Sequence, residues 1–126
     1  FGMTGGQMAP TTLDGQVTTT SPYGRDITLS GPPIDLPKTI ATLDGAVYVA
    51  AVSVDTPKNI RLAKKAIKKA FQVQQLGLGF ALVSVLSTCP TNWGMSPVDS
   101  IKWLQEKMLP TYQMGELKVS EEVAKI

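Results

Sequence analysis

The stretch Ala46-Val47-Tyr48-Val49-Ala50-Ala51-Val52-Ser53-Val54 decides the fold of this 126-residue chain. It is a run of strand length that is rich in β-branched residues, which predicts a β-strand. The run is apolar on both faces, as a central strand of a parallel sheet is. A second run of the same kind lies at residues 79–87. We therefore expect two neighbouring strands that form the centre of a sheet.

The segment between these runs is predicted to be a helix. Asp55-Thr56-Pro57 is a strong helix start, with proline at the first helical position. Apolar residues then recur at helical spacing until Gly77, and we expect them to face the sheet: Ile60, Ala63, Ile67, Ala70 and Phe71. Residues 46–87 thus form a strand, helix, strand unit with parallel pairing and a right-handed crossover, and the fold class is α/β with a parallel sheet.

The opposite face of the predicted helix is basic, and its cations are Lys58, Arg61, Lys64, Lys65, Lys68 and Lys69. Such a stripe could dock an acidic partner such as a ferredoxin, or a phosphate backbone. A charge run opposite an apolar stripe is, however, the ordinary pattern of a solvated helix face, and we prefer this second interpretation.

Two shorter helices are expected to flank the unit. The first begins at an N-cap, Asp35, and ends at Asp44-Gly45, with inward residues Leu36, Ile40 and Leu43. The second follows the cap Ser96-Pro97-Val98-Asp99, with Pro110 beyond its end and with inward residues Ile101, Leu104 and Met108. Helix capping explains Asp44, Asp55 and Asp99. The tail at residues 112–126 is mixed, with a closing helical turn at 121–125.

Composition limits the function classes. Twelve basic and ten acidic residues give a formal charge of +2, which is too small to argue for a nucleic-acid partner. The chain has no histidine and one cysteine, so an internal disulfide is excluded and the commonest general base is absent. We expect a single cytoplasmic domain spanning 1–126, since no apolar run reaches the roughly 18 residues of a membrane span. An enzyme built on this chain needs a cofactor or residues from another polypeptide.

The first 33 residues are rich in Gly, Thr, Ser and Pro, a composition shared by ordered loops and flexible tails. Interspersed apolar residues favour an ordered loop: Met3, Met8, Leu13, Val17 and Tyr23. The opening Phe1-Gly2-Met3-Thr4-Gly5-Gly6-Gln7 suits a phosphate-binding loop, because glycines let N–H groups approach an anion closely. Such loops normally follow a strand, so the chain is expected to be the second half of a larger fold.

A second candidate segment follows the second strand: Ser87-Thr88-Cys89-Pro90-Thr91-Asn92-Trp93-Gly94. Ligands of parallel sheets bind beyond the carboxyl ends of the strands. Cys89 therefore has two open interpretations, a metal ligand or a small buried hydrophobe. A nucleophilic role is disfavoured because no histidine can activate the thiol. Trp93 and Trp103 are interpreted as core or interface anchors rather than as cofactor-stacking groups.

Together these two segments resemble the thiamine diphosphate-binding β subunit of the 2-oxoacid:ferredoxin oxidoreductases, above all its branched-chain (2-oxoisovalerate) and 2-oxoglutarate members. The resemblance continues through Ser96-Pro97 and Trp103 to a tail pattern of Pro110, Tyr112, Gly115 and Lys118. It implies the C-terminal half of a thiamine diphosphate-binding fold, with a cofactor loop region at 1–33, a strand, helix, strand core at 34–118 and a tail at 119–126. Ala51 departs from the pattern, where arginine is common.

The resemblance also implies roles for individual residues. Gly2, Met3 and Thr4 would lie along the diphosphate and thiazolium, while Gly5, Gly6 and Gln7 would shape the turn. Cys89 would be the fourth ligand of a four-iron four-sulfur cluster. The three other cysteines and the residues that hold Mg²⁺ would lie upstream of Phe1, and no catalytic side chain is implied.

The implied activity is oxidative decarboxylation of a 2-oxoacid to an acyl-coenzyme A, with reduction of ferredoxin. The implied partners are the α subunit, γ or δ subunits where these exist, ferredoxin, the 2-oxoacid and coenzyme A; neither a nucleic acid nor a membrane is expected as a partner. This chain alone is expected to be inactive. The alternative is a non-catalytic α/β interaction module that binds only another subunit.

Overall fold

The expected strand, helix, strand unit is present in the computed structural model, which describes all 126 residues. β1 (Ala46–Ser53) pairs in parallel with β2 (Phe80–Leu86), and α3 (Pro57–Gln75) connects them. Thr56 caps α3, because its hydroxyl accepts a hydrogen bond from the Asn59 N–H at 3.1 Å. The α/β class is therefore confirmed.

A third strand makes the sheet mixed. β3 (Gly115–Val119) pairs antiparallel with β1, and the strand order is β2-β1-β3. The sequence prediction missed this strand and was wrong in treating the tail as irregular up to its last turn. The helical turn itself is confirmed in a shorter form as a 3₁₀ turn, η2 (Val123–Lys125).

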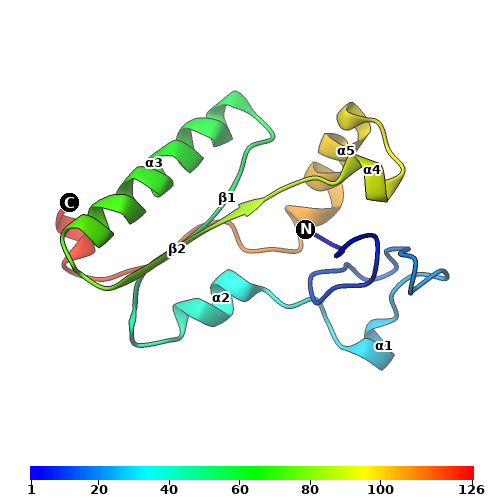
Figure 1. The fold of residues 1–126 in the computed structure, drawn as a ribbon, viewed down its shortest axis with the longest axis horizontal. Coiled ribbons are helices and arrows are strands. Elements are labelled where there is room, and N and C mark those ends of the chain that lie inside the picture. The colour runs from blue at the N-terminus through cyan, green and yellow to red at the C-terminus, as the bar shows by residue number, and fades with distance from the viewer. The chain divides into compact units, whose positions relative to one another are not determined.

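Helices cover both faces of this sheet. Figure 1 shows α3 along one face and α2 (Leu36–Ala41) on the other. The double cover explains why β1 is buried at every position except Val47, which is partly exposed. The predicted inward face of α2 was wrong for Leu36 and Leu43, which are exposed, whereas Ile40 is partly buried and Pro37 is buried. A helix of six residues is too short to present a full apolar stripe.

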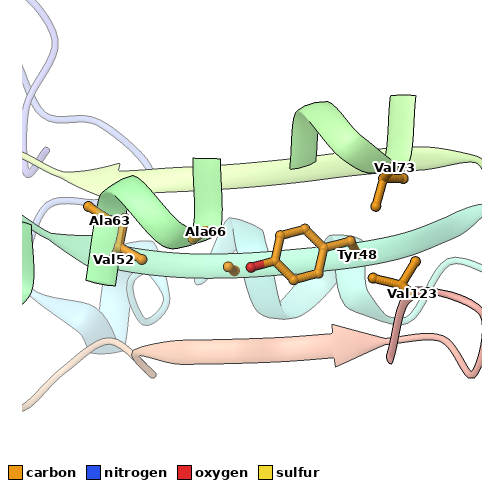
Figure 2. Packing of buried hydrophobic residues seen from close by; sticks show 7 residues of the cluster. Tyr48, Val52, Ala63, Ala66, Val73 and Val123 are labelled. Atoms are coloured by element: carbon orange, nitrogen blue, oxygen red, sulfur yellow. The ribbon is translucent and has the colours of Figure 1, made fainter. Parts of the chain in front are cut away.

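The core of the sheet lies between β1 and α3 and is closed at one end by η2 (Figure 2). Its buried members are Tyr48, Ala50, Val52, Ala63, Ala66, Val73 and Val123. Of the five residues predicted to face the sheet from α3, Ala63 is buried and Ala70 is partly buried. Ile60, Ile67 and Phe71 are exposed, and the prediction was wrong for them. They lie on the flank of α3 at the edge strand β2, where no further strand follows and where Ile67 and Phe71 line an open groove.

The chain divides into two compact units. The sheet unit comprises Leu36–Leu86 and Gln113–Ile126, and the loop unit comprises Phe1–Asp35 and Ser87–Tyr112. Regular elements of the loop unit are short: α1 (Ile27–Ser30), α4 (Pro90–Trp93), α5 (Pro97–Trp103) and a π-helical turn, η1 (Leu104–Met108). α4 is a single helical turn in the candidate segment that follows β2. None of the chain's helices combines the length and apolar character needed to cross a membrane.

The cap and most of the inward face of α5 were predicted correctly. Ser96 accepts a hydrogen bond from the Asp99 N–H at 3.2 Å and donates one to the Asp99 carboxylate at 2.6 Å. Leu104 and Met108 are buried, but Ile101 is exposed and Ser100 is buried in its place. The reason is register, since residues 100, 104 and 108 are spaced at i, i+4 and i+8 on one stripe.

Candidate functional site

The opening segment of the loop unit contains a tight turn. The N–H of Thr4 donates to the Gln7 carbonyl at 3.0 Å, and the N–H of Gln7 donates to the Thr4 carbonyl at 2.9 Å. Gly5 and Gly6 occupy the two central positions with φ of 54° and 85°, a region that favours glycine. Within the chain, the N–H groups of Met3, Gly5 and Gly6 have no acceptor. These three groups are the backbone donors that the segment can offer to an anion.

Two threonines fix the backbone just before this turn. The Gly2 N–H donates to Thr11 Oγ1 at 3.1 Å, and the Thr12 hydroxyl donates to the Gly2 carbonyl at 2.6 Å. Thr12 is fully buried, and its oxygen also accepts the Ala9 N–H at 2.8 Å. A side chain at position 2 would be strained, since φ is 80° and the Gln16 amide nitrogen, 2.9 Å from its Cβ, would have to move. The segment is therefore held in place before any ligand binds.

Arg25 organises the rest of this loop and was not singled out from the sequence. Its side chain is only 6% exposed, and its guanidinium donates to a ring of backbone carbonyls rather than to a carboxylate. Nη1 contacts Ala9, Pro10 and Thr12 at 3.1, 3.1 and 2.7 Å, and Nη2 contacts Ser30, Gly31 and Pro32 at 3.3, 2.9 and 3.3 Å. The guanidinium thus joins two stretches of the first 35 residues.

The interpretation of residues 1–33 as an ordered loop agrees with this network, but the expected cause was wrong. Of the apolar residues thought to anchor it, Leu13 is buried, whereas Met8, Val17 and Tyr23 are exposed. Polar contacts to the backbone replace apolar packing here. The available signal was that Arg25 is the only cation before Lys38 in a stretch of uncharged loop residues and aspartates.

The structure brings the second candidate segment against the opening one. The Phe1 nitrogen lies 3.5 Å from the Ser87 carbonyl oxygen. A Cβ placed on Gly6 would lie 3.5 Å from Asn92 Oδ1, and the Asn92 amide nitrogen lies 3.4 Å from Cys89 Sγ. Asn92 thus lies beside the glycine turn and within hydrogen-bond distance of the cysteine. Cys89 is partly exposed and precedes α4 at its N-cap position, so its sulfur is not enclosed in an aliphatic core.

Trp93 and Trp103 pack against each other, with ring centroids 4.6 Å apart and planes tilted by 51°. This contact agrees with their interpretation as packing anchors. Trp93 Nε1 is buried and has no hydrogen-bond partner in the chain, which is costly for an indole N–H. This indole N–H lies four positions after Cys89 and is available to donate a hydrogen bond to a bound group or to another chain.

The metal-ligating residues of this chain do not form a complete site. No three side chains of the types His, Cys, Asp and Glu lie together. Cys89 is the chain's one cysteine, and a four-iron cluster is held by about four cysteine ligands, so three would have to come from outside this chain. The donor set therefore fits a partial contribution to a cluster.

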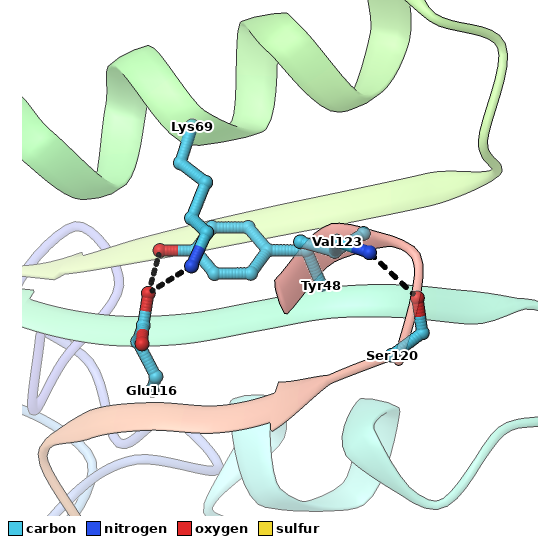
Figure 3. Close-up of polar contacts among 5 residues, drawn as sticks. All are labelled: Tyr48, Lys69, Glu116, Ser120 and Val123. Atoms are coloured by element: carbon cyan, nitrogen blue, oxygen red, sulfur yellow. Dashed lines mark hydrogen bonds and ion pairs between the residues drawn. The ribbon is translucent and has the colours of Figure 1, made fainter. Parts of the chain in front are cut away.

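A second polar cluster lies in the sheet unit and ties its elements together (Figure 3). Glu116 Oε1 of β3 accepts hydrogen bonds from the Tyr48 hydroxyl of β1 at 3.0 Å and from Lys69 Nζ of α3 at 3.3 Å. Burial raises the pKa of Tyr48, and the hydrogen bond to Glu116 raises it further, so the phenol stays protonated. We interpret this cluster as structural, since it joins three elements and adjoins the core.

The sheet unit also contains a groove of about 430 Å³ between α3 and β2, lined by Ile67, Ala70, Phe71, Gln74, Phe80, Ala81 and Val83. Its lining has no titratable or nucleophilic side chain. The groove therefore offers apolar contact and no chemistry, and the candidate site remains the pair of segments in the loop unit.

Comparison with known proteins found relatives of the chain, of which three are described here. The chain is 46% identical over 108 residues to ketoisovalerate oxidoreductase subunit VorA of Methanothermobacter marburgensis, an alignment covering 86% of this chain and 23% of that protein. It is 42% identical over 106 residues to 2-oxoglutarate synthase subunit KorB of Archaeoglobus fulgidus, covering 84% and 35%. It is 36% identical over 132 residues to KorB of Methanocaldococcus jannaschii, covering 100% and 44%.

The chain therefore spans less than half the length of the relatives it matches. No protein-family model and no solved structure matches it. The relatives carry the names of the two groups, branched-chain and 2-oxoglutarate, that the sequence resembles. The resemblance is thus confirmed.

Proposed function

We propose that this chain, a homologue of part of the ketoisovalerate oxidoreductase and 2-oxoglutarate synthase subunits, supplies part of the cofactor site of a 2-oxoacid:ferredoxin oxidoreductase. The complete enzyme would release carbon dioxide from a 2-oxoacid, transfer the acyl group to the thiol of coenzyme A and pass an electron pair to ferredoxin. The α subunit and the remainder of the enzyme would supply what this chain lacks.

One observation carries the proposal: the glycine turn and the cysteine segment adjoin within the same compact unit, with Asn92 beside the turn and hydrogen-bonded to Cys89. They are far apart in sequence, so nothing local requires this contact. An electron-transfer enzyme needs the centre where its substrate is oxidised close to the first electron acceptor. The contact between the two segments meets that need.

The opening segment would bind the diphosphate of thiamine diphosphate. Gly2, Met3 and Thr4 would lie along the cofactor, and Gly5, Gly6 and Gln7 would hold the turn. The unpaired N–H groups of Met3, Gly5 and Gly6 suit an anionic oxygen. Thiamine diphosphate, when bound, supplies the electron sink that decarboxylation requires. The residues of this chain would position it, and Mg²⁺ would be held by residues from outside the chain.

Cys89 would contribute one thiolate to a four-iron four-sulfur cluster. Its partial exposure leaves the sulfur accessible to ligation, and the Asn92 amide lies within hydrogen-bond distance of it. Hydrogen bonds to ligand sulfur tune the reduction potential of such clusters. Asn92 would therefore act as a positioning residue for the thiolate.

The ligand role is tested in the assembled enzyme by replacing Cys89→Ala and, as a matched control in the same loop, Ser87→Ala. We expect the cysteine variant to lose the visible absorbance and the electron paramagnetic resonance signal of one cluster, together with ferredoxin reduction. The Ser87→Ala control should keep the absorbance, the resonance signal and ferredoxin reduction. Full cluster signals in the cysteine variant would refute the assignment.

The cofactor loop is tested with two glycine variants that carry the same backbone strain. Gly5 has φ of 54° and Gly15 has φ of 69°, and an added Cβ meets no atom within 4 Å at either position. We expect Gly5→Ala to weaken thiamine diphosphate binding by about tenfold and Gly15→Ala to leave it within about twofold. Equal effects in calorimetry of the assembled enzyme would place the cofactor elsewhere.

A further inference from the structure

The helix α3 carries six cations and no anion along its 19 residues. Five of them are exposed, and we define these as the basic stripe: Lys58, Arg61, Lys64, Lys65 and Lys68. The sixth, Lys69, is partly buried and pairs with Glu116 at 3.3 Å. The basic stripe has no ion pair within the chain.

The basic stripe lies opposite the buried side of α3. With a period of 3.6 residues, Arg61, Lys64 and Lys68 point away from the buried residues Ala63, Ala66 and Val73. Like charges at i, i+3 and i, i+4 repel and destabilise a helix by a few tenths of a kcal/mol per pair. A solvated helix face normally reduces this repulsion with interspersed acidic residues, and α3 has none.

Net positive charge is found on this helix and not on the remainder of the chain. Six of the twelve cations lie on α3, so the remaining chain has six cations and ten anions, a formal charge of −4. A nucleic acid is a long polyanion and is bound by broad positive surfaces, which the negative remainder of this chain would oppose. A compact acidic protein needs only a surface of the size of α3, which is about 28 Å long.

We propose that the basic stripe of α3 is the docking surface for a small acidic protein. Charge complementarity supplies the attraction and speeds association, and the exposed apolar residues Ile67 and Phe71 on the flank of the stripe add contact area. That the acidic protein is the ferredoxin of the reaction rests on the proposed function. The docking surface itself follows from the charges on α3.

The experiment compares two double charge reversals in the full chain. Lys64→Glu with Lys68→Glu alters the basic stripe, and Lys107→Glu with Lys125→Glu makes the same change in net charge at exposed lysines elsewhere. Binding of a purified acidic ferredoxin is measured by calorimetry at low and at physiological ionic strength. We expect the stripe variant to bind at least about tenfold more weakly, with a smaller salt dependence, and the control to change by less than about threefold.

If the two variants lost ferredoxin affinity equally, the net charge of the chain and not the basic stripe would explain the loss, and the proposal would be overturned. A short DNA duplex is a second probe, and tighter binding of the duplex through the same lysines would assign the stripe to nucleic acid instead. Thermal unfolding followed by circular dichroism serves as the folding control, and the stripe variant should not melt earlier because the reversal relieves repulsion. In the assembled enzyme the stripe variant should keep the electron paramagnetic resonance signal of the cluster, so failure of the cluster assignment and failure of the docking surface are distinguishable.

Discussion

The two units of this chain are stabilised in different ways. In the sheet unit, apolar side chains from β1 and α3 meet in a continuous core, and polar contacts such as the cluster at Glu116 lie beside it. In the loop unit, the first 35 residues contain one short helix, and buried polar side chains, chiefly Arg25 and Thr12, hold the backbone. One unit depends on the amount of apolar surface buried, the other on the geometry of particular hydrogen bonds.

This difference has a functional meaning. A loop that binds an anion must leave some N–H groups free, and regular helices or strands would use most of them. Side chains that reach carbonyl groups fix the loop without occupying those donors. Arg25 satisfies carbonyls on both sides of its loop and leaves the N–H groups of Gly5 and Gly6 unpaired.

The largest expected effect comes from removing Arg25. Arg25→Ala leaves a ring of buried carbonyls without donors, and we expect a loss of about 3 to 5 kcal/mol in the stability of the loop unit. Hydrogen exchange measured by mass spectrometry should show residues 1–35 losing protection while β1 and α3 keep theirs. Arg25→Lys is the matched variant, and it should fail almost as badly, since an ammonium group has three donors and cannot span both stretches. Uniform loss of protection across both units would contradict the contrast drawn here.

The sheet unit should respond to a change of apolar volume. Val73 of α3 is fully buried in the core, which also contains Val123 of η2. Val73→Ala removes two methyl groups from this core. We expect a loss of about 2 kcal/mol in the free energy of unfolding, from lost burial and from the cavity left behind. Urea denaturation followed by circular dichroism measures it. A change below about 0.5 kcal/mol would mean that the core is loosely packed around this position.

Alkaline pH should weaken the loop unit through Tyr112, whose hydroxyl donates to the Thr11 carbonyl. Burial raises the pKa of Tyr112 to about 12 from an ordinary value of 10.0, against a lowering by Arg25 and with a further rise from Asp35. The folded state therefore holds the phenol proton more tightly than the unfolded state. The stability it adds is complete below pH 10 and is lost as pH rises from 10 to about 12.

Tyr112→Phe tests this dependence. It should cost about 1 kcal/mol at neutral pH, for the lost hydrogen bond, and should flatten the decline above pH 10. Tyr23→Phe is the control, because Tyr23 is fully exposed and should change neither quantity. Urea denaturation on either side of pH 10 provides the measurement. If the stability of the Tyr112→Phe variant fell as steeply at alkaline pH, groups other than Tyr112 would be the cause of the decline.

The sequence predicted the sheet unit better than the loop unit, for physical reasons. The β-branched runs at β1 and β2 and the Thr56-Pro57 start of α3 are local signals, and all three elements were found. β3 has five residues and includes two charged side chains, and it pairs with β1, which is distant in sequence. No local sequence pattern therefore predicts it. The role of Arg25 depends on backbone carbonyls, which every residue has, and no pattern of side chains encodes it. The resemblance to a known family indicated that the two segments belong to one site. The position of Asn92, beside the glycine turn and hydrogen-bonded to Cys89, was not predicted.

The smallest effect is expected where the predicted inward face of α3 was wrong. Phe71 is 66% exposed, although its helical spacing suggested the core, whereas Val73 two residues later is fully buried. Phe71→Ser should therefore change the free energy of unfolding by less than about 0.5 kcal/mol, despite removing a larger side chain than Val73→Ala does. The same urea denaturation measures both variants. Periodicity gives the spacing of an apolar stripe but not where the sheet beneath it ends, and β2 ends the sheet on this side. A loss for the serine variant as large as that for Val73→Ala would show that the chain buries this flank of α3 in solution.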